Sequence, residues 1–233
     1  MTTVDFLPKG YPVPSLQRLP LYLRQLKQYA REGREMVSCT QIADDLGLIS
    51  VQVRKDLSMT GISGRPKVGY SVESLISTIE SFLGWDKERK AVLAGAGSLG
   101  SAILGYPGFV EHGLHIAAAF DVDMSKVGHS IRGRMVHPLS ELADYIKSNQ
   151  ILIGIITVPQ AGAQAVTDLM IESGVRAIWN YSPAQLIIPP HVVCETVKLS
   201  STFAVLSSRL KDMLDAEAAQ ASSNEPNEPR NND

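Results

Sequence analysis

Residues 91–100 read Ala-Val-Leu-Ala-Gly-Ala-Gly-Ser-Leu-Gly, a short apolar run that ends in a Gly-x-Gly-x-x-Gly motif. The apolar run is typical of a buried strand, and the residues from Ser98 onward are typical of the start of a helix. Gly95 permits a tight turn, Gly97 lets the backbone approach a pyrophosphate, and Gly100 lets the helix pack closely on the sheet. The phosphates would then face the positive end of the helix dipole. The stretch therefore predicts a dinucleotide-binding turn.

A carboxylate at the end of the next apolar run supports this interpretation. Residues 114–121 read Leu-His-Ile-Ala-Ala-Ala-Phe-Asp, and Asp121 lies 21 positions after Gly100. An acidic residue at about this distance accepts hydrogen bonds from a ribose diol and repels a 2′-phosphate, which favours NAD(H) over NADP(H). The alternative is a glycine-rich turn in an ordinary α/β protein, with Asp121 as a solubilising residue at the end of a strand.

The charge is distributed unevenly along the 233 residues, although the net charge is only −2. Between Ser15 and Tyr70, nine Lys or Arg residues stand against five Asp or Glu residues, so this part is basic and the remainder is acidic. A basic amino-terminal part indicates contact with a polyanion.

Several classes of protein are disfavoured by the composition. The two cysteines and five histidines show no metal-ligand spacing, so we expect neither a bound metal nor a disulfide framework. The longest apolar run, residues 151–158, is too short to span a bilayer, and the amino terminus lacks a signal-peptide pattern. We therefore expect a cytoplasmic protein without membrane contact.

The amino-terminal part predicts a small helical domain. Residues 1–14 hold three prolines and are expected to form an extended arm. The first helix is expected to start near Arg18, because Pro20 fits only in a first turn. Residues 40–57 predict two short helices joined by a tight turn, with Ser50 as the cap of the second.

Two helices joined in this way are typical of a helix-turn-helix, whose second helix enters the DNA major groove. Residues 61–70 have glycines at both ends and a basic tip, which predicts a small hairpin that forms the wing of a winged-helix domain. The alternative is a plain helical hairpin with solvated charges. The residues expected to contact DNA are Ser50, Gln52, Arg54, Lys55, Ser58, Arg65 and Lys67.

Strands and helices alternate from residue 90 onward, which is typical of a doubly wound parallel sheet with helices on both faces. We predict a connecting helix at 72–83, strands at 91–95, 115–120, 151–157, 176–180 and 192–197, a weaker strand near 135–136, and helices at 98–105, 139–148 and 160–173. Thr157, Val158, Pro159, Asn180 and Tyr181 end strands and are therefore expected at the ligand-binding edge of the sheet.

The end of the chain predicts a partner subunit. A helix at 201–214 has an apolar face that its own domain offers nothing to cover, so a second subunit is the natural cover. Residues 216–233 are rich in Ala, Ser, Asn, Glu and Pro and are expected to be disordered.

Taken together, these motifs resemble the Rex family of bacterial redox-sensing transcriptional repressors, over roughly residues 10–215. The shared motifs, in chain order, are Arg18-Leu19-Pro20-Leu21-Tyr22, Val53-Arg54-Lys55-Asp56-Leu57-Ser58, Val68-Gly69-Tyr70, Gly95-x-Gly-x-Leu-Gly100, Tyr106-Pro107-Gly108-Phe109, Phe120-Asp121-Val122-Asp123 and Thr157-Val158-Pro159. The resemblance implies a homodimer that binds operator DNA when free or bound to NAD⁺ and releases it when NADH binds. It also implies a winged-helix domain at 15–84, a Rossmann domain at 85–199 and a carboxy-terminal helix at 200–215 that the subunits exchange.

The resemblance and the sheet-edge argument together give a set of site residues. Tyr106 would lie near the nicotinamide, Asp121 at the adenosine ribose, and Arg18 at the linkage between the domains. The residues expected to bind NAD(H) are Gly95, Ala96, Gly97, Ser98, Leu99, Gly100, Tyr106, Asp121, Val122, Thr157, Val158, Pro159, Asn180 and Tyr181. Arg18, Tyr106 and Lys198 are expected to form the redox switch, and no catalytic residue is predicted.

The chain departs from the family pattern at the predicted switch. The family usually shows Glu-Asn-Val-Asp where this chain reads Glu-Thr-Val-Lys at 195–198, so Lys198 would repel Arg18 where an aspartate would pair with it. The segment 58–61 lacks the usual aromatic residue, and the wing lacks an extra glycine. Three functions follow: a repressor that responds to NADH, a repressor whose redox response is weakened or altered, and an NAD-dependent oxidoreductase. The isolated histidines offer the third no convincing proton-transfer site.

Overall fold

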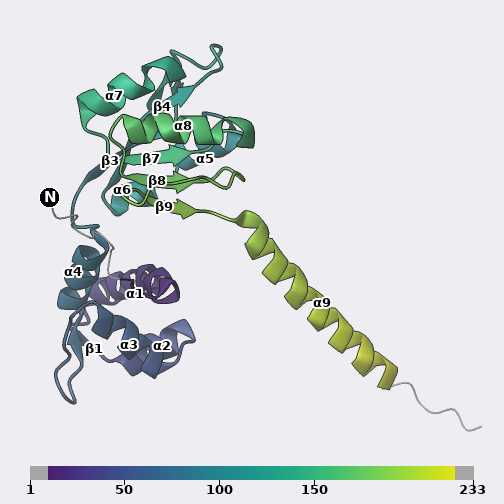
Figure 1. The fold of residues 1–233 in the computed structure, drawn as a ribbon. Helices are drawn as coiled ribbons and strands as arrows, with labels where there is room; N and C mark the ends of the chain where they lie inside the picture. Colours follow the sequence, from purple (N-terminus) through teal and green to yellow (C-terminus); the bar gives the residue numbers. More distant parts are fainter. Residues whose placement is uncertain (1–9, 224–233) are drawn as a thin grey trace, which may run out of the picture.

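The computed structural model describes residues 10–223, which form a small helical domain, a seven-stranded α/β domain and a long carboxy-terminal helix (Figure 1). The helical domain contains α1 (Val13–Arg31), β1 (Met36–Val37), α2 (Cys39–Leu46), α3 (Ser50–Met59), β2 (Tyr70–Ser71) and α4 (Val72–Leu83). Strands β1 and β2 pair as a short antiparallel ribbon. The apolar faces of the four helices meet in one core, because their apolar residues recur at helical spacing.

The start of the first helix and the cap of α3 differ from the predictions. Helix α1 begins at Val13 rather than near Arg18, so Pro20 lies inside the helix and the expected arm is shorter. Pro14 occupies the first turn, where the missing N–H has no intrahelical partner to lose. The hydrogen bond that Pro20 lacks is offset by the buried face of α1, which includes Leu19. The second difference concerns Ser50, because Ile49 occupies the cap position of α3 and Ser50 is its first residue.

The predicted wing is a tight turn rather than a full hairpin. A single antiparallel bridge between Arg65 and Gly69 closes it, and the β1–β2 ribbon supports its base. Its basic residues, Arg65 and Lys67, line the same groove as Ser38 at the start of α2.

The α/β domain is built on a sheet with the strand order β5-β6-β4-β3-β7-β8-β9. The strands are β3 (Arg89–Ala94), β4 (Leu114–Asp121), β5 (Ser130–Ile131), β6 (Arg134–Pro138), β7 (Ile153–Ile156), β8 (Ala177–Asn180) and β9 (Val193–Thr196). All neighbours pair in parallel except β5 and β6. The chain winds outward from β3 in both directions, so a crevice opens at the carboxyl end of that strand.

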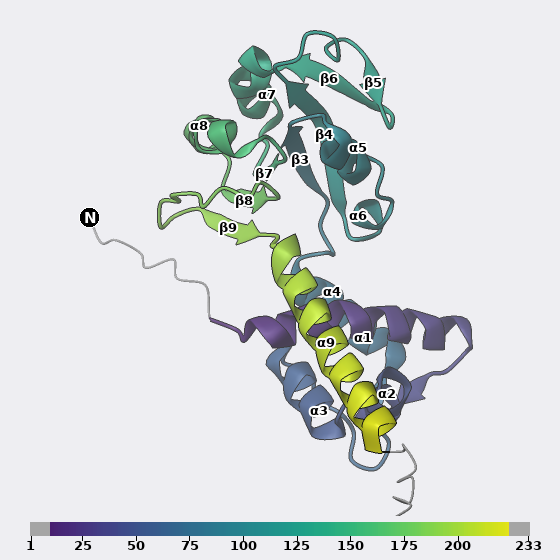
Figure 2. The ribbon, with the colours of Figure 1, turned by 90° about the vertical axis from the view of Figure 1, so that its right-hand side faces the viewer.

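Helices cover both faces of the sheet, as the alternating pattern predicted. Figure 2 shows α5 (Ser98–Leu104) and α6 (Gly108–Glu111) on one face, and α7 (Leu142–Asn149) and α8 (Gln160–Glu172) on the other. Each face has its own apolar cluster. The six predicted strands and three predicted helices are present. Strand β5 and helix α6 were not predicted, and α7 is preceded by a 3-10 turn, Leu139–Glu141.

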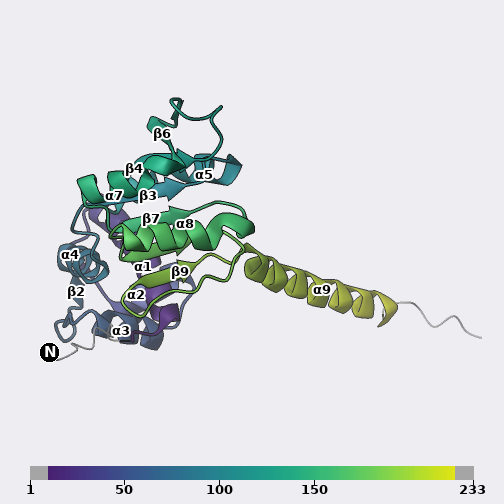
Figure 3. The same ribbon diagram turned by 45° about the horizontal axis from the view of Figure 1, so that its top comes forward.

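Helix α9 (Leu199–Ser223) extends away from both domains (Figures 1 and 3). Its apolar side chains are exposed, among them Phe203 at 67% and Leu206 at 63%. The prediction of disorder from residue 216 is wrong as far as Ser223, because the alanine-rich sequence continues the helix. The rest of that predicted tail, residues 224–233, lies outside the described residues. Between residues 10 and 223, no helix is both long and apolar enough to cross a membrane.

A candidate dinucleotide site and a candidate nucleic-acid interface

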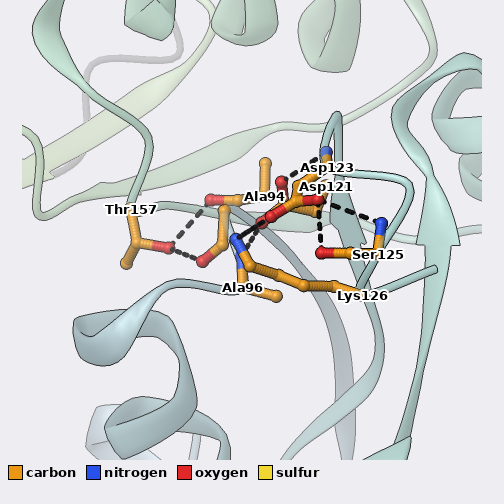
Figure 4. A network of polar contacts seen from close by, with 8 residues as sticks. Ala94, Ala96, Asp121, Asp123, Ser125, Lys126 and Thr157 are labelled. Atoms are coloured by element: carbon orange, nitrogen blue, oxygen red, sulfur yellow. Dashed lines mark hydrogen bonds and ion pairs between the residues drawn. The ribbon is translucent and has the colours of Figure 1, made fainter. Parts of the chain in front are cut away.

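The glycine turn between β3 and α5 is held by the neighbouring strand. Gly95 has a φ of 99°, and a Cβ there would lie 2.8 Å from the backbone of Thr157. The single proton of the Thr157 hydroxyl is shared between the carbonyls of Ala94, at 2.8 Å, and Gly95, at 2.7 Å (Figure 4). Glycine is required at this position, since any other residue would push β3 and β7 apart.

The two other glycines of the motif serve different purposes. A Cβ at Gly100 would lie 2.0 Å from the Gly95 carbonyl oxygen, so the start of α5 packs directly on the turn. A Cβ at Gly97 would meet no atom within 4 Å, so the space in front of it is open. The first N–H groups of α5, from Ser98 onward, have no partner within the helix and are suited to bind a phosphate.

Asp121 lies beside this turn but is largely occupied by the protein itself. Its carboxylate accepts hydrogen bonds from the backbone N–H of Ala96, at 2.8 Å, and of Asp123, at 2.9 Å, and from the Lys126 ammonium, at 3.2 Å (Figure 4). Burial alone would raise the pKa of Asp121, but these donors hold it below its usual value. Asp121 therefore shapes the turn, and Lys126 is a residue of this site that the sequence analysis missed. The Lys126 ammonium also lies 3.3 Å from the Asp123 carboxylate.

Aromatic side chains connect two of the predicted cofactor residues. Tyr106 is 57% exposed and meets Phe109 edge-on at 4.8 Å between ring centroids. Phe109 meets Trp179 at 5.2 Å, and Trp179 meets Tyr181 at 5.2 Å. Burial raises the pKa of Tyr181. The sequence analysis did not assign Phe109 or Trp179 to this row, which offers a surface on which a planar ring can stack.

The remaining predicted cofactor residues divide into exposed and structural ones. Val122 is 75% exposed, and Pro159 is exposed at the start of α8. Asn180 is fully buried: its Nδ2 donates to the Ala184 carbonyl at 3.0 Å, and its Oδ1 accepts from the Ser182 N–H at 2.9 Å. Asn180 thus fixes the loop after β8. Ala96 is buried beneath the turn, Leu99 is 40% exposed, and Val158 is half-buried.

A basic groove lies on the helical domain. Arg54 from α3 and Arg65 and Lys67 from the predicted wing line it, together with Ser38 and its neighbours at the start of α2. All three basic side chains are exposed. At the start of α2 a capping box pairs the N–H groups of Ser38 and Gln41, and the positive end of the helix dipole there favours an anion. This arrangement is suited to a phosphate backbone.

The other predicted DNA-binding residues lie on different parts of α3. Gln52 and Lys55 line a second groove, between α3 and the start of α1. Lys55 and Ser58 are exposed, and the Ser58 hydroxyl donates to the Lys55 carbonyl at 2.7 Å. Ser50 is half-buried in the first turn of the helix.

Arg18 is paired within the helical domain. Its Nε donates to Asp56 Oδ2 at 2.6 Å, and its Nη2 donates to Asp56 Oδ1 at 2.9 Å. Tyr106 and Lys198, the other predicted switch residues, belong to the α/β domain and the segment that leads to α9. Arg18 thus pairs with a carboxylate of its own domain, and its predicted repulsion by Lys198 stays a prediction.

Comparisons with known proteins match both parts of the chain. Residues 11–58 match the family described as "Putative DNA-binding protein N-terminus", and residues 86–184 match the family described as "CoA binding domain". A redox-sensing transcriptional repressor Rex of Treponema denticola is 46% identical over 83% of this chain and 92% of its own length. One of Bacteroides thetaiotaomicron is 40% identical over 85% of this chain and 90% of its own length.

Solved structures agree with these relatives. The crystal structure of RSP, a Rex-family repressor, in complex with NAD⁺ and operator DNA is 31% identical, with a TM-score of 0.83 over 92% of this chain and 99% of that chain. The complex of RSP with NADH has a TM-score of 0.80 over 91% of this chain and 100% of that chain, again at 31% identity. The agreement spans the helical domain, the glycine turn and the sheet together. The chain belongs to the Rex family of redox-sensing transcriptional repressors.

Proposed function

We propose that this protein is a homodimeric transcriptional repressor that binds operator DNA and releases it when NADH occupies the α/β domain. The observation that carries the proposal is the presence, in one chain, of a glycine turn open to a pyrophosphate and of a basic groove beside a helix-turn-helix. Relatives that match over most of their own length are named repressors, which disfavours the oxidoreductase alternative.

The nucleotide is proposed to lie across the carboxyl ends of β4, β3 and β7. Its pyrophosphate would meet the open space at Gly97 and the N–H groups at the start of α5. The nicotinamide would reach the aromatic row that begins at Tyr106, and the adenosine ribose would lie on the side of Asp121 and Lys126. RSP is known with NAD⁺ and with NADH, which supports a cofactor of this class.

DNA binding is proposed for the face that carries α3 and the turn at 64–70. Arg54, Lys55 and Gln52 would reach base edges or nearby phosphates, and Arg65 and Lys67 would contact the backbone. Because most of the affinity would come from phosphate neutralisation, it should fall steeply with salt. RSP is known in complex with operator DNA. A repressor acts where the chromosome is, so we propose a cytoplasmic location.

The dimer is proposed from α9. Its exposed apolar face has no cover in its own chain among residues 10–223, and a second copy would supply one by exchanging the helix. The exchange would also place part of each subunit against the other. A rearrangement caused by nucleotide binding in one subunit could then move the DNA-binding domains of both subunits.

The test is the binding of the full-length protein to a duplex that it selects from a random-sequence library, titrated with NADH and with NAD⁺. NADH should release the DNA at lower concentration than NAD⁺, because a ligand shifts an equilibrium only through its differential affinity for the two states. Equal and negligible effects of both nucleotides would contradict the redox response. If Lys198→Asp then restored release by NADH, the altered-response alternative would hold.

A matched pair of glycine variants tests the nucleotide site itself. Gly97→Ala places a methyl group in the open space that the pyrophosphate would occupy, at a φ of −78°, which any residue adopts. Gly162→Ala adds the same group to α8, also with no atom within 4 Å. We expect Gly97→Ala to weaken NADH binding at least about tenfold with an unchanged fold, and Gly162→Ala to bind normally. Normal binding by both variants would place the nucleotide elsewhere.

A further inference from the structure

We propose that Asp56 is a positioning residue for DNA recognition, which fixes how α3 lies against α1 and thereby aims the side chains that read bases. The inference rests on the proposed function, because it concerns the same DNA-binding helix. Asp56 is 2% exposed and is the only charged residue among the three buried residues of α3. Its neighbour Lys55 is exposed, so the helix presents one face to solvent and inserts a carboxylate on the other.

Three hydrogen bonds from α1 converge on this carboxylate. Arg18 donates from Nε and from Nη2 to the two different oxygens of Asp56, at 2.6 Å and 2.9 Å. The Tyr22 hydroxyl donates to Oδ2 at 2.7 Å, and Arg18 Nη2 also donates to the Ser15 hydroxyl at 3.2 Å. Arg18 and Tyr22 are four residues apart on one helix and therefore share a face. A planar guanidinium that meets both oxygens fixes the orientation of the carboxylate as well as its distance.

The other buried contacts of α3 are less directional. Val53 and Leu57 are apolar and belong to the core of the domain. Apolar packing of roughly the right volume tolerates small rotations and shifts of a helix. A buried ion pair does not, because the attraction that offsets the desolvation of its charges is lost when its geometry is lost. The network around Asp56 therefore sets the rotation of α3 about its own axis.

That rotation matters because Arg54 and Lys55 immediately precede Asp56. Hydrogen bonds to base edges require side chains at defined positions, whereas attraction to phosphates requires mainly charge. If the network around Asp56 is removed, discrimination between sequences should fall while affinity for unrelated DNA is largely kept. A loss of folded protein would lower both affinities by the same factor and leave their ratio unchanged.

The experiment uses the full-length protein with two probes: a duplex enriched by the wild type from a random-sequence library, and a shuffled duplex of equal length and composition. The variant Arg18→Met/Tyr22→Phe/Asp56→Leu replaces the network by apolar side chains and leaves the net charge unchanged. The control Lys27→Met/Glu80→Leu removes another ion pair of α1, 2.7 Å long and directed to α4, again without changing the net charge.

In the triple variant we expect the ratio of the affinity for the enriched duplex to that for the shuffled duplex to fall about tenfold. The affinity for the shuffled duplex itself should change less than about threefold. In the control the ratio should stay unchanged. Arg18→Lys keeps the charge but not the two-pronged contact, so it should also lower the ratio and serves if the triple variant does not fold. An unchanged ratio in Arg18→Lys, or an equal fall in the control, overturns the inference. A wild type that does not distinguish the two duplexes contradicts the proposed function, and the inference falls with it.

Discussion

The two domains each bury an aspartate, and they hold it in different ways. Asp121 accepts from two backbone N–H groups, that of Asp123 two residues on and that of Ala96 25 residues back, and from the Lys126 ammonium five residues on. Asp56 is stabilised by the side chains of Arg18 and Tyr22, which are 38 and 34 residues away in sequence. Asp121 is therefore held largely by backbone N–H groups, which the pairing of β3 with β4 brings close, whereas Asp56 is held by side chains whose meeting depends on how two helices pack.

The largest expected effect on stability comes from Asp56→Ala. This change leaves the Arg18 guanidinium partly buried without its partner and the Tyr22 hydroxyl without an acceptor. We expect the free energy of unfolding of the helical domain to fall by about 3 kcal/mol. Denaturant unfolding, followed by a tryptophan-independent signal such as far-ultraviolet circular dichroism, measures it. A loss below about 1 kcal/mol, the size found for exposed pairs, would show that the network is not buried in solution.

A smaller effect is expected from Asp121→Ala, because two of the three groups that lose an acceptor are neutral backbone N–H groups and the third, Lys126, is partly exposed to solvent. The N–H of Ala96 loses its acceptor, which costs about 1–3 kcal/mol of unfolding free energy in the α/β domain. NADH binding should weaken as well, since the glycine turn loses the contact that shapes it. Both are measured on one preparation by denaturant unfolding and nucleotide titration. If binding fell while stability did not, Asp121 would act on the ribose rather than on the turn.

The buried aspartate of the helical domain also predicts how the stability of the protein responds to acid. Burial alone would raise the pKa of Asp56, but the hydrogen bonds from Arg18 and Tyr22 lower it below its usual value. A carboxylate whose pKa is lower in the folded state stabilises the fold at pH values above its unfolded pKa, about 3.9, and loses that contribution as the pH falls through the folded pKa. The free energy of unfolding should therefore decrease below about pH 4. In Asp56→Asn it should decrease less steeply, and equal slopes would contradict the assignment.

The smallest expected effect is that of Lys126→Met. The Lys126 ammonium contacts Asp121 at 3.2 Å and Asp123 at 3.3 Å, but its side chain is 34% exposed, so solvent screens both pairs. We expect the free energy of unfolding to fall by less than about 1 kcal/mol. The difference in unfolding free energy between the wild type and the variant should be present at low salt and disappear at high salt. A salt-independent loss of several kcal/mol would mean that Lys126 is as essential to its domain as Arg18 is to the other.

Local patterns predicted most of the fold. The alternation after residue 90 gave the strands and main helices, because parallel strands buried on both faces read as apolar runs. The errors lie where packing overrides a local preference, as at Pro20 inside α1, and where alanine propensity extends α9 beyond the predicted end. Strand β5 is only two residues long and has no periodicity to detect.

The candidate nucleotide site could be predicted only in part, because some of its residues meet only through tertiary packing. The glycines and Asp121 lie in one motif, so their spacing identified them. Phe109 and Trp179 come together with Tyr106 only because α6 packs on the face of the sheet that carries the Trp179 side chain. Asn180 ends a strand as expected, yet the structure buries its side chain.

By itself, the sequence determined a nucleotide-type turn, a basic helix-turn-helix and an apolar helix in need of a partner, because each is written in contiguous residues with a fixed period or spacing. The tertiary structure decided which carboxylate each charged group meets. Arg18 pairs with Asp56 because α1 and α3 cross at that point, and no spacing along the chain encodes a crossing point. Contacts of this kind depend on the packing of side chains from distant segments, which exists only once the core has formed.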